Sequence, residues 1–301
     1  MKILYIGVHD YKNETKWRSE TSINASFNKN GIQTIRLDYR SILKNSDISS
    51  LKDLITSSSK ECDVVFLQRG DNLNPEIFNQ VEIPIIFWST EPINLKNDID
   101  LLLHSKIFSW VYLHTYGCLQ RVEREFQHIT DRCSVLHNAL PKDRVVLENQ
   151  NFQKEYFAIF NRNLSLRRRR WLLPSWRHIK IIKNHYGDLY FQDLAKSHLA
   201  INVHYSSKNL DDFETGIFEA IASGSVVLSE TLDQRVLQDL NLNDAIIQFD
   251  SPKDLKQKLI YYKHNLSELD NYRLKSQDSI DKNTWDYRMS RVKDKFLNIM
   301  I

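Results

Sequence analysis

The sequence predicts an α/β protein of two domains, each built on a parallel β-sheet with helices on both faces. The chain has 301 residues, enough for two domains of about 150 residues each. Hydrophobic residues make up 42% of the chain and charged residues 26%, a composition that can fill a sizeable core. Short β-rich apolar runs alternate with helical stretches, and this alternation restarts after a polar segment in the middle of the chain.

Six short apolar runs predict the strands of the first domain. They are residues 2–8, 33–37, 63–67, 84–88, 108–113 and 134–136. The intervening segments are long enough for helices, which favours parallel strands. Gly7 ends the first run, but the residues after it lack the Gly-x-Gly-x-x-Gly pattern that cradles a dinucleotide pyrophosphate. A nicotinamide-dependent enzyme is therefore disfavoured.

A polar stretch over residues 147–154 predicts a linker, after which a second domain begins. Its expected strands are residues 155–160, 179–182, 199–203, 226–229 and 245–249, with a helix over 212–223. Ser251 is a predicted helix N-cap because Pro252 and Asp254 follow it. An apolar stripe from Trp285 to Ile299 marks a final helix with one buried face. We expect domains over residues 1–148 and 149–282, followed by this helix over 283–301.

Charge and cysteine content narrow the class of protein. The 41 basic and 38 acidic side chains leave a net charge of +3, which argues against a dedicated, strongly basic nucleic-acid binder. No apolar stretch reaches the roughly 18 residues of a membrane span, and the N-terminal run is too short for a signal-peptide core. Three widely spaced cysteines signal neither a disulfide framework nor a zinc site. A cytoplasmic protein is expected.

The segment from Asn202 to Ser229 contains the most informative pattern. On a helix, one face would carry Phe213, Ile217 and Ile221, and the other would carry Asp212, Thr215, Gly216, Glu219 and Ser223. Gly216 costs the helix about 1 kcal/mol relative to alanine, which is explained if a ligand approaches the backbone there. The helix start would attract phosphate, and Glu219 could accept hydrogen bonds from sugar hydroxyls. Gly224 is the expected C-cap. The alternative is an ordinary core helix with a solvated Glu219.

A longer ordered set of motifs resembles a known family. The run from Phe218 to Gly224 (Phe-Glu-Ala-Ile-Ala-Ser-Gly), followed by an apolar strand, resembles the donor-site signature of two-domain GT-B glycosyltransferases. It is most similar to their group-1-like, spore-maturation-type branch. Supporting pieces follow in order over residues 155–301: 160–162 with the arginines after it, 200–204, 251–255 and 285–288.

The resemblance implies two Rossmann-like domains facing across a cleft, with the last helix crossing back to pack on the first domain. The second domain would bind a nucleotide-sugar donor, and Glu219 matches the ribose-binding glutamate by position. The implied donor-binding set is Arg162, Arg168, His204, Tyr205, Thr215, Gly216 and Glu219. Two positions depart from the pattern: many relatives have arginine where this chain has Gly216, and Asp211 replaces the first glutamate of a Glu-x7-Glu pair.

Positive charge is concentrated beside this set. Residues 154–188 contain nine basic and two acidic side chains. A transferase without a bound metal must stabilise the leaving diphosphate with arginine, lysine and helix N-termini. Arg162 and Arg168 are the candidates for this role. The alternative for each arginine is a solvated basic face.

The acceptor site is expected at the strand ends of the first domain, where polar groups follow three predicted strands at residues 9–10, 69–71 and 89–92. A general base at such a position would remove the proton from the acceptor hydroxyl. Glu91 is the first candidate, because Pro92 keeps it out of the helical region, and Asp71 is the second. A turn or helix-capping carboxylate is the alternative reading of Glu91.

The resemblance implies a metal-independent glycosyltransferase of the hexosyltransferase type, which uses a UDP- or GDP-linked sugar and no other cofactor. Its partners would be the nucleotide-sugar donor and a glycan, lipid-linked or other hydroxyl acceptor, and no nucleic acid. The resemblance alone suggests bacterial surface glycan synthesis, with peripheral contact at the inner face of the membrane. The competing hypotheses are a sugar-nucleotide epimerase of the same two-domain shape and a non-catalytic nucleotide- or carbohydrate-binding protein.

Overall fold

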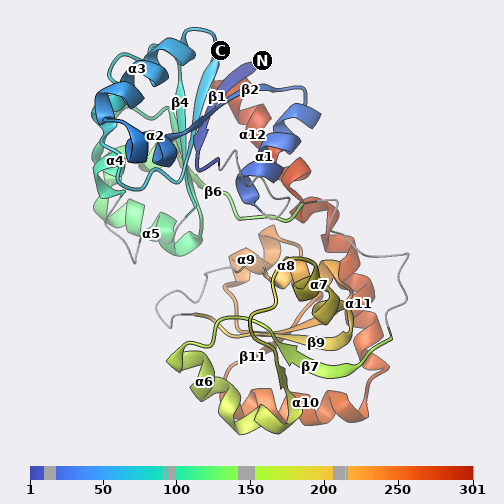
Figure 1. Cartoon of the computed structure of the whole chain (residues 1–301). Coiled ribbons are helices and arrows are strands. Elements are labelled where there is room, and N and C mark those ends of the chain that lie inside the picture. The colour runs from blue at the N-terminus through green and yellow to red at the C-terminus, as the bar shows by residue number, and fades with distance from the viewer. Residues whose placement is uncertain are drawn as a thin grey trace. The chain divides into compact units, whose positions relative to one another are not determined.

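The computed structural model describes residues 1–9, 18–90, 93, 99–141, 153–205, 214 and 216–300. The chain divides into two compact units (Figure 1). Unit 1 comprises Met1–Asn138 and Trp285–Ile301, and unit 2 comprises Ala139–Thr284. The expected boundary at residues 148/149 lies outside the described residues.

Unit 1 contains a parallel sheet of six strands. They are β1 (Lys2–Gly7), β2 (Gln33–Asp38), β3 (Val64–Gln68), β4 (Ile85–Ser89), β5 (Trp110–Leu113) and β6 (Cys133–Val135), in the order β2-β1-β3-β4-β5-β6. Every residue of β3 and β4 is buried, as expected for central parallel strands that are covered on both faces. The six predicted strands are confirmed, with ends that differ by one or two residues.

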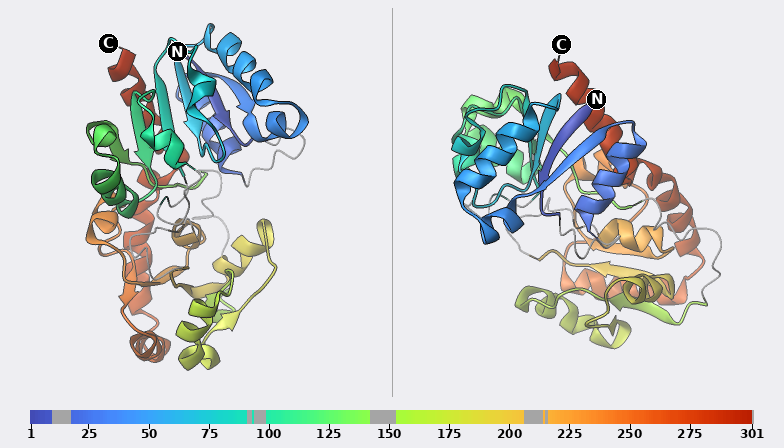
Figure 2. Two further views of the ribbon diagram at one scale, coloured as in Figure 1. Left: turned by 90° about the vertical axis from the view of Figure 1, so that its left-hand side faces the viewer. Right: turned by 45° about the horizontal axis from the view of Figure 1, so that its top comes forward.

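Helices cover both faces of the unit 1 sheet (Figure 2). They are α1 (Ser19–Lys29), α2 (Tyr39–Asn45), α3 (Ile48–Ser59), α4 (Asp100–His104), α5 (Tyr116–Glu125) and α12 (Trp285–Met300), with short 3₁₀ turns η1 (Pro75–Phe78) and η2 (Gln127–Arg132). The final helix α12 packs beside α1, and Phe296 contacts the rings of Phe27 and Phe66. The predicted return of the last helix to the first unit is confirmed.

Unit 2 contains a second parallel sheet, of five strands. They are β7 (Tyr156–Phe160), β8 (Lys180–Ile181), β9 (Ser197–Asn202), β10 (Val226–Glu230) and β11 (Ile247–Phe249), in the order β11-β10-β9-β7-β8. Its helices are α6 (Leu166–Leu172), α7 (Asp188–Ala195), α8 (Gly216–Ala222), α9 (Gln234–Asp239), α10 (Pro252–His264) and α11 (Glu268–Ser279), with 3₁₀ turns η4 (Leu173–His178) and η5 (Asp281–Asn283). The predicted α/β class with two Rossmann-like sheets is therefore confirmed.

Two predicted helix ends in unit 2 have the expected local geometry. Ser251 caps α10, because its hydroxyl accepts a hydrogen bond from the Asp254 amide at 3.1 Å. Gly224 follows α8 with a φ of 77°, the left-handed conformation that ends a helix and favours glycine.

The two sheets share one strand order. When the strands of each unit are numbered along the chain, both sheets have the spatial order 2-1-3-4-5, and the sheet of unit 1 has a sixth strand after the fifth. In such sheets the winding reverses between the first and third strands, and ligands bind at the carboxyl ends of the strands at this reversal point. The topology therefore marks one place in each unit: the ends of β1 and β3 in unit 1, and the ends of β7 and β9 in unit 2. In the described part of the chain, no helix is both long and apolar enough to cross a membrane.

Candidate functional site

The reversal point of unit 2 collects most of the predicted donor-binding residues. Asn161 and Arg162 follow β7, His204 and Tyr205 follow β9, and α8 begins at Gly216 between β9 and β10. Arg168, the buried arginine of α6, reaches the same edge through its hydrogen bonds to Val203 and Glu214. The six predicted donor-binding residues that the structure describes gather here: Arg162, Arg168, His204, Tyr205, Gly216 and Glu219. Thr215 lies outside the described residues.

Glu214 joins two arginines at this edge. Its carboxylate accepts hydrogen bonds from Arg162 Nη1 and from Arg168 Nη2. Arg168 also donates from Nε to the Val203 carbonyl at 2.8 Å and from Nη1 to the Asn163 carbonyl at 3.0 Å. The side chain of Arg162 is 12% exposed and that of Arg168 is 4% exposed. Burial lowers the pKa of Arg168, although the Glu214 carboxylate opposes that effect. The site therefore holds two fixed guanidinium groups that already share one anionic group.

Arg162 explains the glycine at position 216. A Cβ atom built at Gly216 would overlap the guanidinium of Arg162, so any larger residue must displace that side chain. The sequence suggested that a ligand lies against this backbone; in the structure, the group that lies against Gly216 is Arg162. The resemblance leads one to expect an arginine at position 216 itself. In this chain, Arg162 brings a guanidinium to that place from the end of β7.

The helix α8 is buried around nearly its whole circumference, which corrects the predicted division into a core face and a site face. Gly216, Ile217, Phe218, Ala220, Ile221 and Ala222 are all buried, and Glu219 is only partly exposed. The helix packs against α7, α11 and the strands β9 and β10, so neighbours cover most of the face that the sequence assigned to a ligand, and Glu219 keeps partial exposure on it.

Glu219 is held by a residue that the sequence analysis did not select. Tyr190, on α7, donates its hydroxyl to Glu219 Oε2 at 2.9 Å. Burial, together with the charge of Glu219, raises the pKa of Tyr190 well above its usual value, so the tyrosine remains a hydrogen-bond donor at neutral pH. One carboxylate oxygen of Glu219 is thereby oriented by the protein.

A second arginine–glutamate pair lies between the ends of β9 and β10. Arg167 donates both Nη atoms to the carboxylate of Glu230, and its Nη1 also donates to the His204 carbonyl at 2.7 Å. The His204 amide donates to Glu230 Oε2 at 3.0 Å, and the His204 ring Nε2 lies 3.0 Å from the Thr231 carbonyl. Arg167, which was not among the residues chosen from the sequence, therefore fixes the loop that carries His204 and Tyr205.

Three buried polar atoms at the same edge have no hydrogen-bond partner among the described residues: Asn161 Nδ2, Asn202 Oδ1 and His204 Nδ1. Ile159 lies opposite Ala200 in the pairing of β7 with β9, so Asn161 and Asn202 occupy corresponding positions at the ends of these strands. Buried polar groups in folded proteins are normally hydrogen-bonded. The polar network at the reversal point is therefore incomplete among the described residues.

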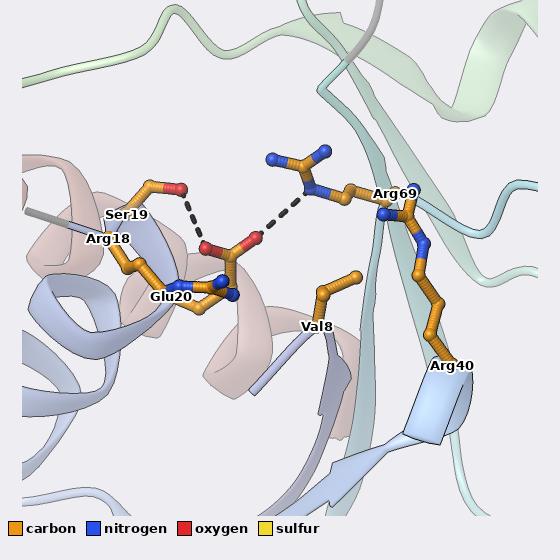
Figure 3. A pocket seen from close by; sticks show the side chains of 6 residues that line it. All are labelled: Val8, Arg18, Ser19, Glu20, Arg40 and Arg69. Carbon is orange, nitrogen blue, oxygen red and sulfur yellow. Dashed lines mark hydrogen bonds and ion pairs between the residues drawn. The ribbon is translucent and has the colours of Figure 1, made fainter. Parts of the chain in front are cut away.

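The reversal point of unit 1 forms an open pocket of about 380 Å³ (Figure 3). Its lining residues are Val8, Arg18, Ser19, Glu20, Arg40 and Arg69. Glu20 Oε1 accepts from Arg69 Nε at 3.0 Å, and the Ser19 hydroxyl donates to Glu20 Oε2 at 3.1 Å. Arg69 has a φ of 73°, a left-handed conformation that costs a non-glycine residue about 1–3 kcal/mol. Strain of this kind clusters at binding sites, and here it lies beside the pocket.

Asp71, the second candidate for the general base, lies beside this pocket. Its carboxylate accepts from the Tyr39 hydroxyl at 2.6 Å and from Arg40 Nη2 at 2.7 and 2.6 Å. Burial acts to raise the pKa of Asp71, but the hydrogen bonds from Arg40 and Tyr39 outweigh it and lower that pKa. A carboxylate held in this way is a weak proton acceptor. Glu91, the first candidate, lies outside the described residues.

Comparisons with known proteins agree with this architecture. Residues 151–294 match a family described as glycosyl transferase-like. No curated protein matches the chain in sequence. The structure of Anabaena Alr3699/HepE in complex with UDP-glucose resembles the chain with 9% identity and a TM-score of 0.68, covering 99% of this chain and 100% of that one. A glycosyltransferase from Rickettsia africae ESF-5 does so with 12% identity, a TM-score of 0.69 and coverage of 99% and 98%.

A sucrose-phosphate synthase from Thermosynechococcus elongatus also resembles the chain over 99% of both chains, with 9% identity and a TM-score of 0.60. The chain has the GT-B fold. At these identities the likeness to the solved structures concerns the fold alone. The match to the glycosyl transferase-like family covers the part of the GT-B fold from β7 through most of α12, and it includes every residue of the unit 2 site.

Among the described residues, no cluster of three or more His, Cys, Asp or Glu side chains is placed to hold a metal ion.

Proposed function

We propose that the chain is a glycosyltransferase that moves a sugar from a nucleotide-diphosphate sugar to an acceptor hydroxyl. One observation carries this proposal. At the reversal point of unit 2, two buried guanidinium groups share the carboxylate of Glu214, and Glu219 lies on the adjoining helix. This cluster lies within the segment that matches the glycosyl transferase-like family.

Such a cluster suits the chemistry of sugar transfer. When the glycosidic bond to the nucleotide breaks, negative charge develops on the departing diphosphate, and fixed positive groups stabilise it. Arg162 is held by the Glu214 carboxylate, and Arg168 by the same carboxylate and by two backbone carbonyls, so both need little reorganisation to meet that charge. A carboxylate offers two acceptor oxygens, which suit a sugar diol, and Glu219 is the carboxylate proposed to accept from the ribose hydroxyls.

The donor is proposed to be a UDP-linked hexose. Support comes from the Anabaena Alr3699/HepE structures, whose complexes contain UDP, UDP with glucose, and UDP-glucose. GDP is the alternative nucleotide. Transfer without a metal ion, membership of the spore-maturation-type branch and a role in bacterial surface glycan synthesis are further parts of the proposal.

The acceptor is proposed to bind at the unit 1 pocket. Support comes from its place at the strand reversal point and from the strained Arg69 beside it. Three arginines line this pocket, so an acceptor that carries a negative charge would suit it better than a neutral one. Glu91 remains the proposed base, because the bonds that hold Asp71 make it the weaker candidate.

Isothermal titration with UDP, GDP, ADP and CDP tests the donor site. The wild-type protein should bind one diphosphate selectively, and Glu219→Ala should abolish that binding. Tyr190→Phe is the matched control, because it removes only the hydroxyl that orients Glu219 and should weaken binding by a factor of about 5. Absence of binding by the wild-type protein would contradict the proposal.

Product analysis separates the proposal from its competitors. A transferase should release the free nucleoside diphosphate in proportion to the glycosylated acceptor. Conversion of the sugar nucleotide without any acceptor would indicate the epimerase instead. Tight nucleotide binding with no turnover against a broad acceptor panel would indicate the non-catalytic binding protein.

A further inference from the structure

The consecutive elements α6 and η4 in unit 2 present one face to solvent and one to the protein core. The residues that point inward are Arg168, Leu172, Ser175 and Ile179, all buried and spaced by three or four positions. Leu172 and Ile179 belong to the hydrophobic core of unit 2, and both elements pack against α10. The inward face is therefore fully used in packing.

The opposite face, here called the outer face, has a composition that packing does not explain. It consists of Leu166, Arg169, Arg170, Leu173, Trp176 and Arg177, which recur at the spacing of one helix side. Leu166, Leu173 and Trp176 are 75%, 67% and 59% exposed. All three arginines are exposed as well, and no acidic residue occurs between Glu155 and Asp188 in the sequence.

The outer face combines exposed apolar side chains with arginines, as helices at a membrane surface do. A single exposed leucine is ordinary, but three large apolar side chains interleaved with three cations on one helix face match the pattern of helices that lie in a membrane interface. Trp176 suits the level of the lipid headgroups, where an indole ring can bury its apolar body and keep its N–H hydrated. The guanidinium of Arg177 lies 5.6 Å from the centre of the Trp176 ring, so a cation accompanies that ring.

We propose that the outer face of α6 and η4 binds the surface of an anionic lipid bilayer. Leu166, Leu173 and Trp176 enter the headgroup region, while Arg169, Arg170 and Arg177 contact lipid phosphates. The charge complementarity comes from three exposed arginines in a stretch of sequence that has no acid between Glu155 and Asp188. A nucleic acid would be attracted by the same arginines, but single-stranded binding surfaces rely on stacked aromatic rings, and this face offers one ring and two leucines. The inference goes beyond the proposed function and does not depend on it.

Co-sedimentation of the full chain with vesicles tests the proposal. Vesicles of phosphatidylcholine with about a third phosphatidylglycerol should bind the protein, and vesicles of phosphatidylcholine alone should bind it at least ten times more weakly. The triple variant Arg169→Gln, Arg170→Gln, Arg177→Gln should lose at least a factor of about 10 in binding to the anionic vesicles. The double variant Leu173→Ser, Trp176→Ala should lose a similar factor.

Matched variants elsewhere on the surface serve as controls. Lys44→Gln, Lys60→Gln, Lys282→Gln removes the same number of exposed charges, and Leu274→Ser removes a leucine that is 65% exposed on α11. Both should keep wild-type vesicle binding, and far-UV circular dichroism checks that every variant is folded. Equal binding of the outer-face variants and the controls would overturn the proposal. Failure of the wild-type chain to bind anionic vesicles would overturn it as well. The same holds if the chain binds a DNA oligonucleotide through these arginines but does not bind the vesicles.

Discussion

The reversal points of the two sheets are built from the same residue types but differ in how their arginines are held. In unit 2, Arg162 and Arg168 are almost fully buried and share the single carboxylate of Glu214. In unit 1, Arg40 and Arg69 are 47% and 28% exposed, and each has its own acidic partner. Identical topology therefore carries a rigid cationic site in one unit and a solvated one in the other.

This difference fits two kinds of substrate. Burying a guanidinium is costly, so a buried pair is retained where a fixed charge is needed in one place. A diphosphate is the constant part of a nucleotide-sugar donor, and the rigid site of unit 2 suits it. Solvated arginines in an open pocket can move to fit groups of varied shape, which suits an acceptor. The following substitutions test how far the two sites differ.

The largest effect is expected at Glu214. Glu214→Gln leaves two buried guanidinium groups without a shared anion, so the free energy of unfolding should fall by about 3 kcal/mol. Glu20→Gln is the matched change in unit 1 and should cost about 1 kcal/mol, because Arg69 remains partly hydrated. Urea denaturation measures both. Equal losses in the two units would remove the distinction between the sites.

The next effect is expected at Gly216. Gly216→Ala must displace Arg162, so it should destabilise the protein by about 2 kcal/mol and weaken nucleotide binding as well. Gly224→Ala, at the other end of α8, is the control. Its Cβ would meet open space but its φ is positive, so it should cost about 1 kcal/mol and leave binding intact. If Gly224→Ala lost nucleotide binding and Gly216→Ala kept it, binding would depend on the position of the whole helix α8 and not on Arg162.

The smallest effect is expected at Asp71. Its pKa is lowered in the folded protein, from an ordinary value of 3.8, so its ion pair stabilises the protein above that pH. The contribution is lost as the pH falls through the folded pKa. Asp71→Asn should therefore reduce stability by about 1 kcal/mol at neutral pH, because Arg40 is half exposed, and the difference from wild type should vanish in acid. Stability curves at several pH values measure this, and a constant difference would contradict it.

The sequence predicted the elements of the fold well because hydrophobic runs are local signals. The eleven strands within the described residues all lie where short apolar runs occur, and Ser251 and Gly224 mark helix ends through chemistry within a few residues. The face division of α8 could not be predicted, because α7 and α11 cover the side that an isolated helix would leave open.

The contacts of the site were less predictable. Arg162 and Arg168 were singled out by local charge, and the structure brings them together. Their shared partner Glu214 lies 52 residues beyond Arg162 and has no motif of its own. Tyr190 is likewise separated from Glu219 by 29 residues, and only the packing of α7 on α8 joins them. Gly216 was noticed for its conformational cost, but the side chain that requires it comes from another strand.

We expect the nucleotide to bind at the reversal point of unit 2. Titration of UDP into wild type, Glu219→Ala and Arg40→Gln tests it most directly, since the two variants alter one unit each. Glu219→Ala should abolish UDP binding, and Arg40→Gln should leave the dissociation constant for UDP unchanged. Loss of binding in Arg40→Gln, with binding retained in Glu219→Ala, would instead place the nucleotide in unit 1.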